Sequence, residues 1–215
     1  MKPELTLFEL IEMARQFCGA NHVYADLYGV TDGKAIGTFV EHKFRDLLEA
    51  NFSVMRGNSA KGLDLPSVET DIKVTSRRQP QSSCPFRSAR QKIYGLGYNL
   101  LVMVYEKSDD QTRQLATLGF VCCVLVEKER TADYQLTRLI LETLARDGNK
   151  DDILAILFDR QLPGDEVQLN LLAEEIMLHP PQLGYLTISN ALQWRLQYER
   201  IVKLSEEVAG ISRIV

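Results

Sequence analysis

Two acids and a lysine stand close together in residues 62–76, a stretch otherwise built from turn-forming and β-branched residues. Asp64 comes first, and Asp71 and Lys73 follow inside the run VETDIKVTS. Strand interiors favour Val, Ile and Thr and are depleted in Asp and Lys. Charges at these positions therefore need either a solvent-facing surface or a chemical role.

Side chains alternate between the two faces of a strand, so Asp71 and Lys73 are expected on one face and Ile72 and Val74 on the other. A hairpin-like turn would bring Asp64 beside Asp71. Two partly buried carboxylates repel each other, and Mg²⁺ would compensate, because it takes one or two carboxylates, waters and a substrate phosphate. Lys73 could then orient or help deprotonate the attacking water. The alternative is an exposed ion pair on an edge strand.

A local block of positive charge follows this stretch, although the net charge of the chain is −4. No acid occurs between Ile72 and Tyr105. A basic cluster on a mildly acidic chain is typical of a surface that follows DNA phosphates, whereas the alternative is a solvated basic loop. The basic residues of the block are Lys73, Arg77, Arg78, Arg87, Arg90 and Lys92.

Composition predicts an ordinary globular protein: of 215 residues, 45% are hydrophobic and 25% charged. The N-terminus lacks the features of a signal peptide, and no apolar run approaches bilayer-spanning length, so we expect a soluble cytoplasmic protein with no membrane partner. The four cysteines, Cys18, Cys84, Cys122 and Cys123, show no CxxC spacing and are expected as buried thiols.

Hydrophobic periodicity predicts an α/β fold with a mixed central β-sheet flanked by helices and a helical C-terminal part. We expect a single domain over residues 1–215, with a core at 1–126 and a helical extension at 127–215. Helices are expected at 6–19, 33–52, 131–149, 150–162, 166–178 and 189–210, with caps at Thr6, Thr131 and Ser189, and a short helix or turn within 87–98. Strands are expected at 68–76, 99–107 and 117–129, and a loop at 76–86.

The order of Asp64, a six-residue gap, and then Asp71-Ile72-Lys73 resembles the PD-(D/E)xK nuclease motif. Its spacing is similar to that of the MutH mismatch-repair nicking endonuclease and its restriction-enzyme relatives. The segment GKAIGTFVEHKF resembles the helix that leads to a further active-site acid, which would be Glu41. The segment SARQKIYGLGYNLLVMVYEK resembles the basic helix and buried strand of that group. Lys92 would be its additional catalytic lysine.

The resemblance covers roughly residues 5–126 and implies Mg²⁺-dependent cleavage of double-stranded DNA. It implies that Asp64, Asp71 and the Ile72 carbonyl hold the metal, with Lys73 placing the attacking water. Glu41 would hold a second ion or steer a ligand. Asp71 stands where MutH has glutamate, as in many restriction enzymes. We therefore expect a type II restriction endonuclease, with MutH-like repair nicking or an inactive DNA-binding module as the alternatives.

Base recognition needs side chains that can form paired hydrogen bonds in the major groove. The extension could supply such contacts or the interface of a homodimer. For the predicted final helix, the alternative is an amphipathic element packed on the core. The candidate DNA-binding residues are Arg77, Arg78, Gln79, Arg87 and Arg90 in the basic block, and Asn190, Gln193, Arg195 and Gln197 near the C-terminus.

Overall fold

The computed structural model describes residues 2–54, 63–84, 87–189 and 194–215. The chain divides into two compact units. Unit 1 comprises residues 1–80, 99–126 and 206–215, and unit 2 comprises 81–98 and 127–205. That the chain forms a single domain stays a prediction.

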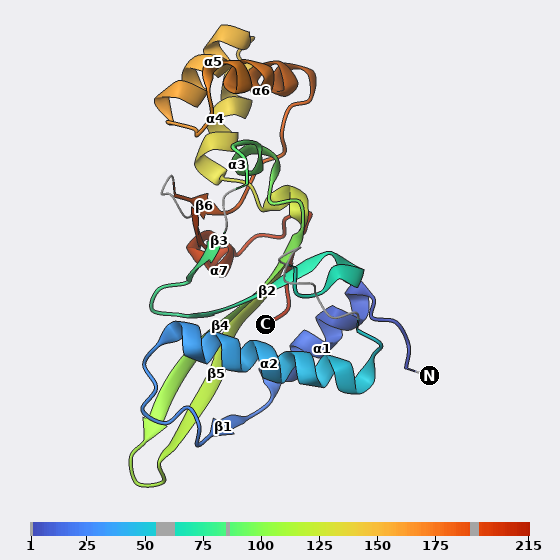
Figure 1. Cartoon of the computed structure of the whole chain (residues 1–215), viewed down its shortest axis with the longest axis vertical. Helices are drawn as coiled ribbons and strands as arrows, with labels where there is room; N and C mark the ends of the chain where they lie inside the picture. The colour runs from blue at the N-terminus through green and yellow to red at the C-terminus, as the bar shows by residue number, and fades with distance from the viewer. Residues whose placement is uncertain (1, 55–62, 85–86, 190–193) are drawn as a thin grey trace. The chain divides into compact units, whose positions relative to one another are not determined.

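Unit 1 is built on a mixed five-stranded β-sheet (Figure 1). Its main path runs β1-β5-β4-β2, and β8 also pairs with β5. The strands β2 and β4 are parallel, whereas the long β4–β5 hairpin is antiparallel. This confirms the predicted mixed sheet. The strands are β1 (His22–Tyr24), β2 (Thr70–Ser76), β4 (Asn99–Asp110), β5 (Leu115–Val126) and β8 (Ile211–Arg213).

Two helices, α1 (Leu7–Gly19) and α2 (Gly33–Asn51), cover one face of this sheet. Thr6 caps α1 with a complete capping box, as predicted. The apolar sides of both helices join Ile72 and Val74 in one hydrophobic core. Because these strand residues are buried on the helix side, the alternate residues of β2 must point to the opposite face.

A tight turn precedes β2 and reverses the chain. It contains a 3₁₀ helix, η1 (Pro66–Val68), and a left-handed Glu69 at φ 47°. Leu65 and Thr70 exchange both backbone hydrogen bonds across the turn, at 2.9 and 3.1 Å. This is the hairpin-like approach that the sequence predicts, and it fixes the segment carrying Asp64 alongside the start of β2.

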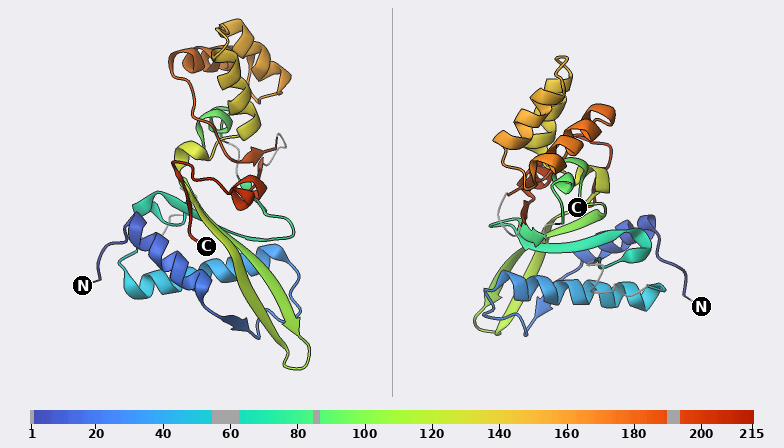
Figure 2. Two further views of the ribbon diagram at one scale, coloured as in Figure 1. Left: turned by 180° about the vertical axis from the view of Figure 1, so that it is seen from behind. Right: turned by 45° about the horizontal axis from the view of Figure 1, so that its top comes forward.

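Unit 2 combines a helical group with a small antiparallel sheet of order β3-β7-β6 (Figure 2). Its helices are α3 (Arg90–Tyr94), η2 (Lys128–Arg130), α4 (Tyr134–Leu144), α5 (Lys150–Asp159), α6 (Glu166–Leu178) and α7 (Glu199–Lys203). Its strands are β3 (Gln81–Cys84), β6 (Thr187–Ile188) and β7 (Trp194–Gln197). A second hydrophobic core joins α3 to α4, α5 and α6.

The prediction of one long helix over 189–210 is wrong. In the described part of this segment, β7 is followed by the short helix α7. The reason is a period of two: Arg195 and Gln197 are exposed, whereas Leu196 and Tyr198 are fully buried. Pairing of β7 with β3 overrides the local helical pattern.

Two smaller predictions also need correction. The predicted loop 76–86 contains β3, whose strand partner β7 lies more than a hundred residues later. The cap of α4 is Asp133, whose side chain accepts the Leu136 N–H at 2.8 Å, and not Thr131. The Thr131 hydroxyl instead donates to the Lys128 carbonyl. Among the described residues, no helix is long and apolar enough to cross a membrane.

Candidate active site

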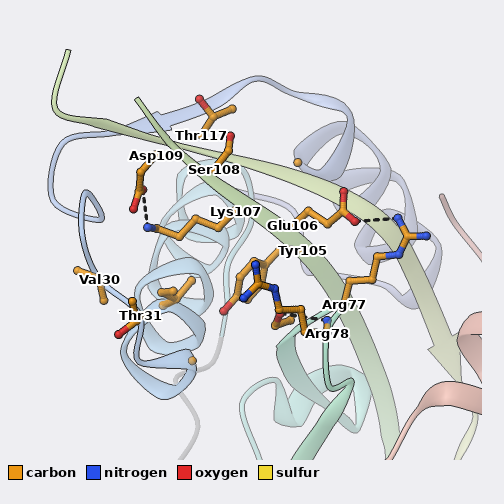
Figure 3. A pocket seen from close by; sticks show the side chains of 14 residues that line it. Val30, Thr31, Arg77, Arg78, Tyr105, Glu106, Lys107, Ser108, Asp109 and Thr117 are labelled. Atoms are coloured by element: carbon orange, nitrogen blue, oxygen red, sulfur yellow. Dashed lines mark hydrogen bonds and ion pairs between the residues drawn. The ribbon is translucent and has the colours of Figure 1, made fainter. Parts of the chain in front are cut away.

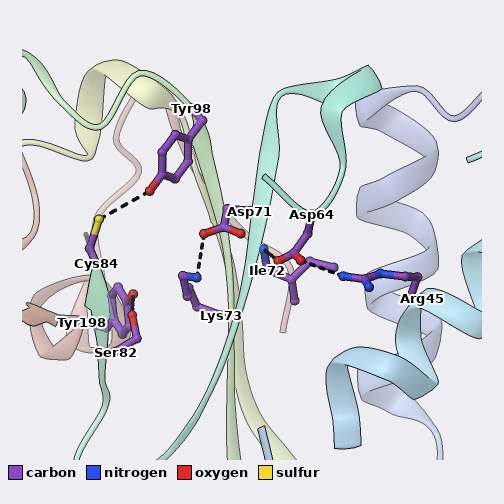
Figure 4. Close-up of polar contacts among 9 residues, drawn as sticks. All are labelled: Arg45, Asp64, Asp71, Ile72, Lys73, Ser82, Cys84, Tyr98 and Tyr198. Carbon is purple, nitrogen blue, oxygen red and sulfur yellow. Dashed lines mark hydrogen bonds and ion pairs between the residues drawn. The ribbon is translucent and has the colours of Figure 1, made fainter. Parts of the chain in front are cut away.

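The strand β2 brings Asp71 and Lys73 together on one face (Figure 4). The Lys73 Nζ lies 2.6 Å from Asp71 Oδ2. The Asp71 side chain is only 6% exposed and that of Lys73 21%. The strand does lie at an end of the sheet path, but the ion pair is largely buried. The alternative of an exposed surface ion pair is therefore excluded.

Asp64 reaches the outer edge of β2 from the preceding turn. Its Oδ2 accepts the backbone N–H of Ile72 at 3.0 Å, and its Oδ1 accepts from Arg45 Nη2 at 2.7 Å. Its carboxyl is also close enough to that of Asp71 to raise the pKa of Asp71. The two acids of the predicted motif thus converge, as the spacing and the turn indicate.

The helix α2 contributes one row of residues at four-residue spacing, Gly37, Glu41 and Arg45, which lie on the same side of the helix. A Cβ at Gly37 would lie 3.1 Å from the Val74 carbonyl oxygen, so glycine permits close approach of the helix to β2. The next residue in the row, Glu41, accepts a hydrogen bond from the Val74 backbone. The third, Arg45, reaches Asp64.

Burial and mutual repulsion make this cluster electrostatically strained. Burial, together with the nearby charge of Asp64, raises the pKa of Glu41 to about 7. Burial and the hydrogen bond to Asp64 raise the pKa of Asp71 to about 7 as well, against the lowering effect of Lys73. Burial lowers the pKa of Lys73, but its acidic neighbours, chiefly Asp71, raise it above its ordinary value overall. Three acids thus face two cations, Lys73 and Arg45.

The donor set fits a small hard cation that keeps water ligands. Among the described residues, no three His, Cys, Asp or Glu side chains form a metal centre by themselves. Asp64 and Asp71 supply a carboxylate pair, and an extended residue points its N–H and C=O to the same side. Since the Ile72 N–H meets Asp64 at the outer edge of β2, its carbonyl is directed to that edge too. One or two carboxylates, a carbonyl and water is the kind of set that Mg²⁺ accepts.

Lys92, the further predicted catalytic lysine, lies on α3 in unit 2 and is 6% exposed. Burial lowers its pKa, and the nearby Asp133 partly offsets that effect. The backbone carbonyl of Lys92 accepts the Asp133 N–H at 2.9 Å. Its catalytic role stays a prediction.

Two arginines of the basic block, Arg77 and Arg90, are paired with acids from elsewhere in the chain. Arg77 lies 2.7 Å from Glu106, and Arg90 bonds both carboxylate oxygens of Glu175. Arg77 and Arg78 line an open hollow of about 910 Å³ in unit 1, which also contains the Lys107–Asp109 ion pair (Figure 3).

The remaining DNA-binding candidates differ in their surroundings. Gln79 and Arg87 are exposed, the first after β2 and the second before α3. Asn190 and Gln193 lie outside the described residues. Arg195 and Gln197 are exposed on β7, a strand and not the predicted helix.

The sequence reasoning missed Arg45. Its position four residues after Glu41, on the same side of a strongly amphipathic helix, was the available signal. Its partner Asp64 could not be inferred from that spacing, because the contact joins a helix to a turn nineteen residues later.

A mixed sheet with two converging acids and a lysine at its edge is an arrangement suited to a deoxyribonuclease. The comparisons agree with this class. A model of the family "Type II restriction enzyme NspV" matches residues 4–213, and the chain belongs to that family. It is 52% identical over 209 residues to the type II restriction enzyme NspV of Nostoc sp. (strain ATCC 29411 / PCC 7524), covering 96% of this chain and 95% of the relative. No solved structure matches significantly.

The protein is therefore a sequence-specific restriction endonuclease, and DNA is its substrate. This confirms the expected type II restriction enzyme. The matched family is one of restriction enzymes, which favours restriction over the alternative of repair nicking.

Proposed function

We propose that this enzyme hydrolyses phosphodiester bonds of double-stranded DNA with Mg²⁺ at the cluster formed by Glu41, Asp64, Asp71 and Lys73. The observation that carries the proposal is the buried Asp71–Lys73 ion pair, with Asp64 bonded to Ile72 beside it. Burying a carboxylate is costly, and retaining two of them side by side favours a chemical role over a structural one.

In this proposal Asp64, Asp71 and the Ile72 carbonyl hold the cation. When bound, the cation supplies positive charge that offsets the repulsion of the acids and stabilises the charge developing at the scissile phosphate. Glu41, which is directed to the Val74 backbone, acts on a water ligand or a second ion. The assignment of these residues to a PD-(D/E)xK motif is part of the same proposal.

Lys73 is placed to orient the attacking water for in-line displacement. Its ammonium group is held within 2.6 Å of Asp71, on the face of β2 that does not join the hydrophobic core. A fixed cation at that position also stabilises the negative charge of the transition state.

DNA cleavage tests the proposal directly. The purified chain is incubated with unmethylated plasmid and Mg²⁺, beside Asp71→Asn and a Ca²⁺ control. We expect discrete fragments from the wild type in Mg²⁺ alone, and a rate for Asp71→Asn lower by roughly 10²- to 10³-fold. Asp46→Asn, an exposed acid on the same helix as Glu41, should cut normally.

Two results would overturn the proposal: full activity of Asp71→Asn, or equal cutting by the wild type in excess chelator. Relaxed circles at hemimethylated sites, in place of fragments, would indicate repair-type nicking. The predicted homodimer is tested separately by sedimentation of the protein with and without DNA.

The exposed arginines of the basic block are proposed to contact DNA phosphates. Arg78, an exposed residue, lines the hollow of unit 1 beside Arg77. Phosphate contacts position a protein on DNA but carry no sequence information. Base recognition therefore needs another surface.

A further inference from the structure

The three-stranded sheet of unit 2 has two chemically distinct faces. Strand alternation places Ser82, Leu196 and Ile188 on one side, where Leu196 and Ile188 are buried and Ser82 is partly buried. Leu196 and Ile188 are 0% and 3% exposed. The Ser82 hydroxyl meets the Tyr198 hydroxyl at 2.5 Å on this side (Figure 4). The sheet is thus attached to the unit through this buried face.

The opposite side is entirely polar, and we call it the polar face. The register pairs Gln81 with Gln197 and Ser83 with Arg195, and it places Thr187 across from Gln197. Ser83, Arg195 and Gln197 are exposed. These five side chains carry amide, guanidinium and hydroxyl groups, and none of them is an acid or an aliphatic residue.

These groups are the ones that recognise base edges in DNA. Arginine pairs with the two acceptors of guanine, glutamine with the donor and acceptor of adenine, and hydroxyls with either. The major groove is about 12 Å wide and admits a two-stranded β-ribbon, and adjacent strands lie about 4.8 Å apart. A patch of two strand pairs therefore spans roughly two or three base pairs.

The charge on this face is available for DNA. Within the described part of the chain, the Arg195 guanidinium forms no ion pair or hydrogen bond; only its backbone bonds, to Ser189. Arg77 and Arg90, in contrast, are neutralised by Glu106 and Glu175. An exposed arginine with no acid beside it fits a negatively charged ligand.

The backbone under the polar face is held firmly. The Ile188 N–H donates to Asp133 Oδ2 at 2.8 Å, and the other oxygen of Asp133 caps α4. Side chains carried by strands anchored in this way keep a defined spacing, which recognition of neighbouring bases requires.

We infer that the polar face, Gln81, Ser83, Thr187, Arg195 and Gln197, recognises base edges in the major groove of double-stranded DNA and sets the cleavage sequence. The inference rests on the proposed function in that it gives that enzyme its specificity. Recognition and cleavage can fail separately, because recognition does not require the acidic cluster of unit 1.

The test measures binding without cleavage. The preferred sequence of the wild type is selected from a random duplex pool in Ca²⁺, and affinities for that duplex and a scrambled one are compared. We expect Arg195→Ala and Gln197→Ala each to lower the ratio of the two affinities on the order of 10- to 100-fold. Binding to the scrambled duplex should change little for Gln197→Ala, which removes no charge.

Matched controls are Arg146→Ala and Gln135→Ala, two exposed residues of unit 2 outside its sheet. Both should keep the wild-type ratio. Ser83→Ala, which removes only an exposed hydroxyl, provides a variant with little risk to folding, and it should alter the base preferred at one position. Circular dichroism verifies that all variants fold.

The inference is overturned if Arg195→Ala and Gln197→Ala fold and keep the wild-type ratio, or if the wild type selects no sequence in Ca²⁺. A wild type that selects a sequence through this face but fails to cut in Mg²⁺ would contradict the proposed chemistry and leave the inference supported. If Arg195→Ala and Gln197→Ala both cut DNA at the wild-type sites, the inference would be contradicted and the proposed chemistry would be supported.

Discussion

Arg45 on α2 and Asp64 in the turn before β2 form an ion pair, with Nη2 2.7 Å from Oδ1. Both side chains are about three-quarters shielded, at 30% and 25% exposed. The pair fixes one oxygen of Asp64, while the Ile72 N–H fixes the other. Arg45 is therefore a positioning residue for a proposed metal ligand, and acts through Asp64.

Replacing Arg45 by Met should weaken the binding of Mg²⁺ more than the binding of DNA. Loss of a residue that orients a metal ligand typically lowers metal affinity or activity 10- to 100-fold. The measurement is the cleavage rate against Mg²⁺ concentration, which should shift to higher concentration and recover partly when Mg²⁺ is raised. Arg45→Lys should restore part of the loss. An unchanged Mg²⁺ dependence would show that Arg45 has only a structural role.

Replacing Glu41 by Gln should change how stability depends on pH in the absence of divalent ions. The folded-state pKa of about 7 lies above the ordinary 4.5, so the native state binds the extra proton between these values. Its stability therefore falls as pH rises through this window, and the loss is complete above 7. Gln does not titrate.

We therefore compare the free energy of unfolding of Glu41→Gln with that of the wild type. From pH 5 to pH 8 we expect this difference to shift in favour of the variant by about 1–2 kcal/mol, after allowance for partial exposure. Urea unfolding in chelator at the two pH values measures this difference. If the difference in unfolding free energy between variant and wild type were identical at pH 5 and pH 8, Glu41 would be ionised throughout this range.

Removing the Lys73 ammonium should slow DNA cleavage while leaving DNA binding nearly unchanged. Lys73→Met is expected to lower the cleavage rate by roughly 10²-fold or more, because it removes both the orientation of the water and a fixed charge. Affinity for DNA in Ca²⁺ should stay within a few-fold. Lys34→Met, at an exposed position on α2, serves as the control. Parallel losses of binding and cleavage would contradict this role.

Neutralising Arg77 and Arg78 together should flatten the salt dependence of DNA binding. Each phosphate contact contributes a slope of about 0.9 in log affinity against log salt. Because Arg77 is paired with Glu106, we expect Arg78 to account for most of the change. Arg15, an exposed arginine paired with Glu12, provides a matched control. An unchanged slope in the double variant would place these arginines away from the DNA.

The parts of the site that could be predicted from the sequence are those set by local geometry. Strand alternation alone puts Asp71 and Lys73 on one face, and a short turn with Pro66 leaves Asp64 few places other than beside Asp71. The strong helical period of α1 and α2 likewise needs no partner to be recognised. Glu41 came from the family resemblance; it bonds to the Val74 backbone, and its role in the site stays a prediction.

What could not be predicted depends on contacts between distant segments. Arg45 meets Asp64 only because Gly37 allows α2 to approach β2 closely. Arg195 and Gln197 lie on a strand because β3, more than a hundred residues earlier, pairs with that segment. A helical pattern of apolar residues was present there, but tertiary pairing overrode it.

The central claim is that Asp64 and Asp71 hold one divalent cation. Crystals of the wild type soaked in Mn²⁺, which substitutes for Mg²⁺ and gives an anomalous signal, test it most directly. We predict a peak at about 2.1 Å from an oxygen of each carboxylate and from the Ile72 carbonyl. A peak bound elsewhere, or an empty site in crystals whose protein cuts DNA with Mn²⁺, would contradict the account.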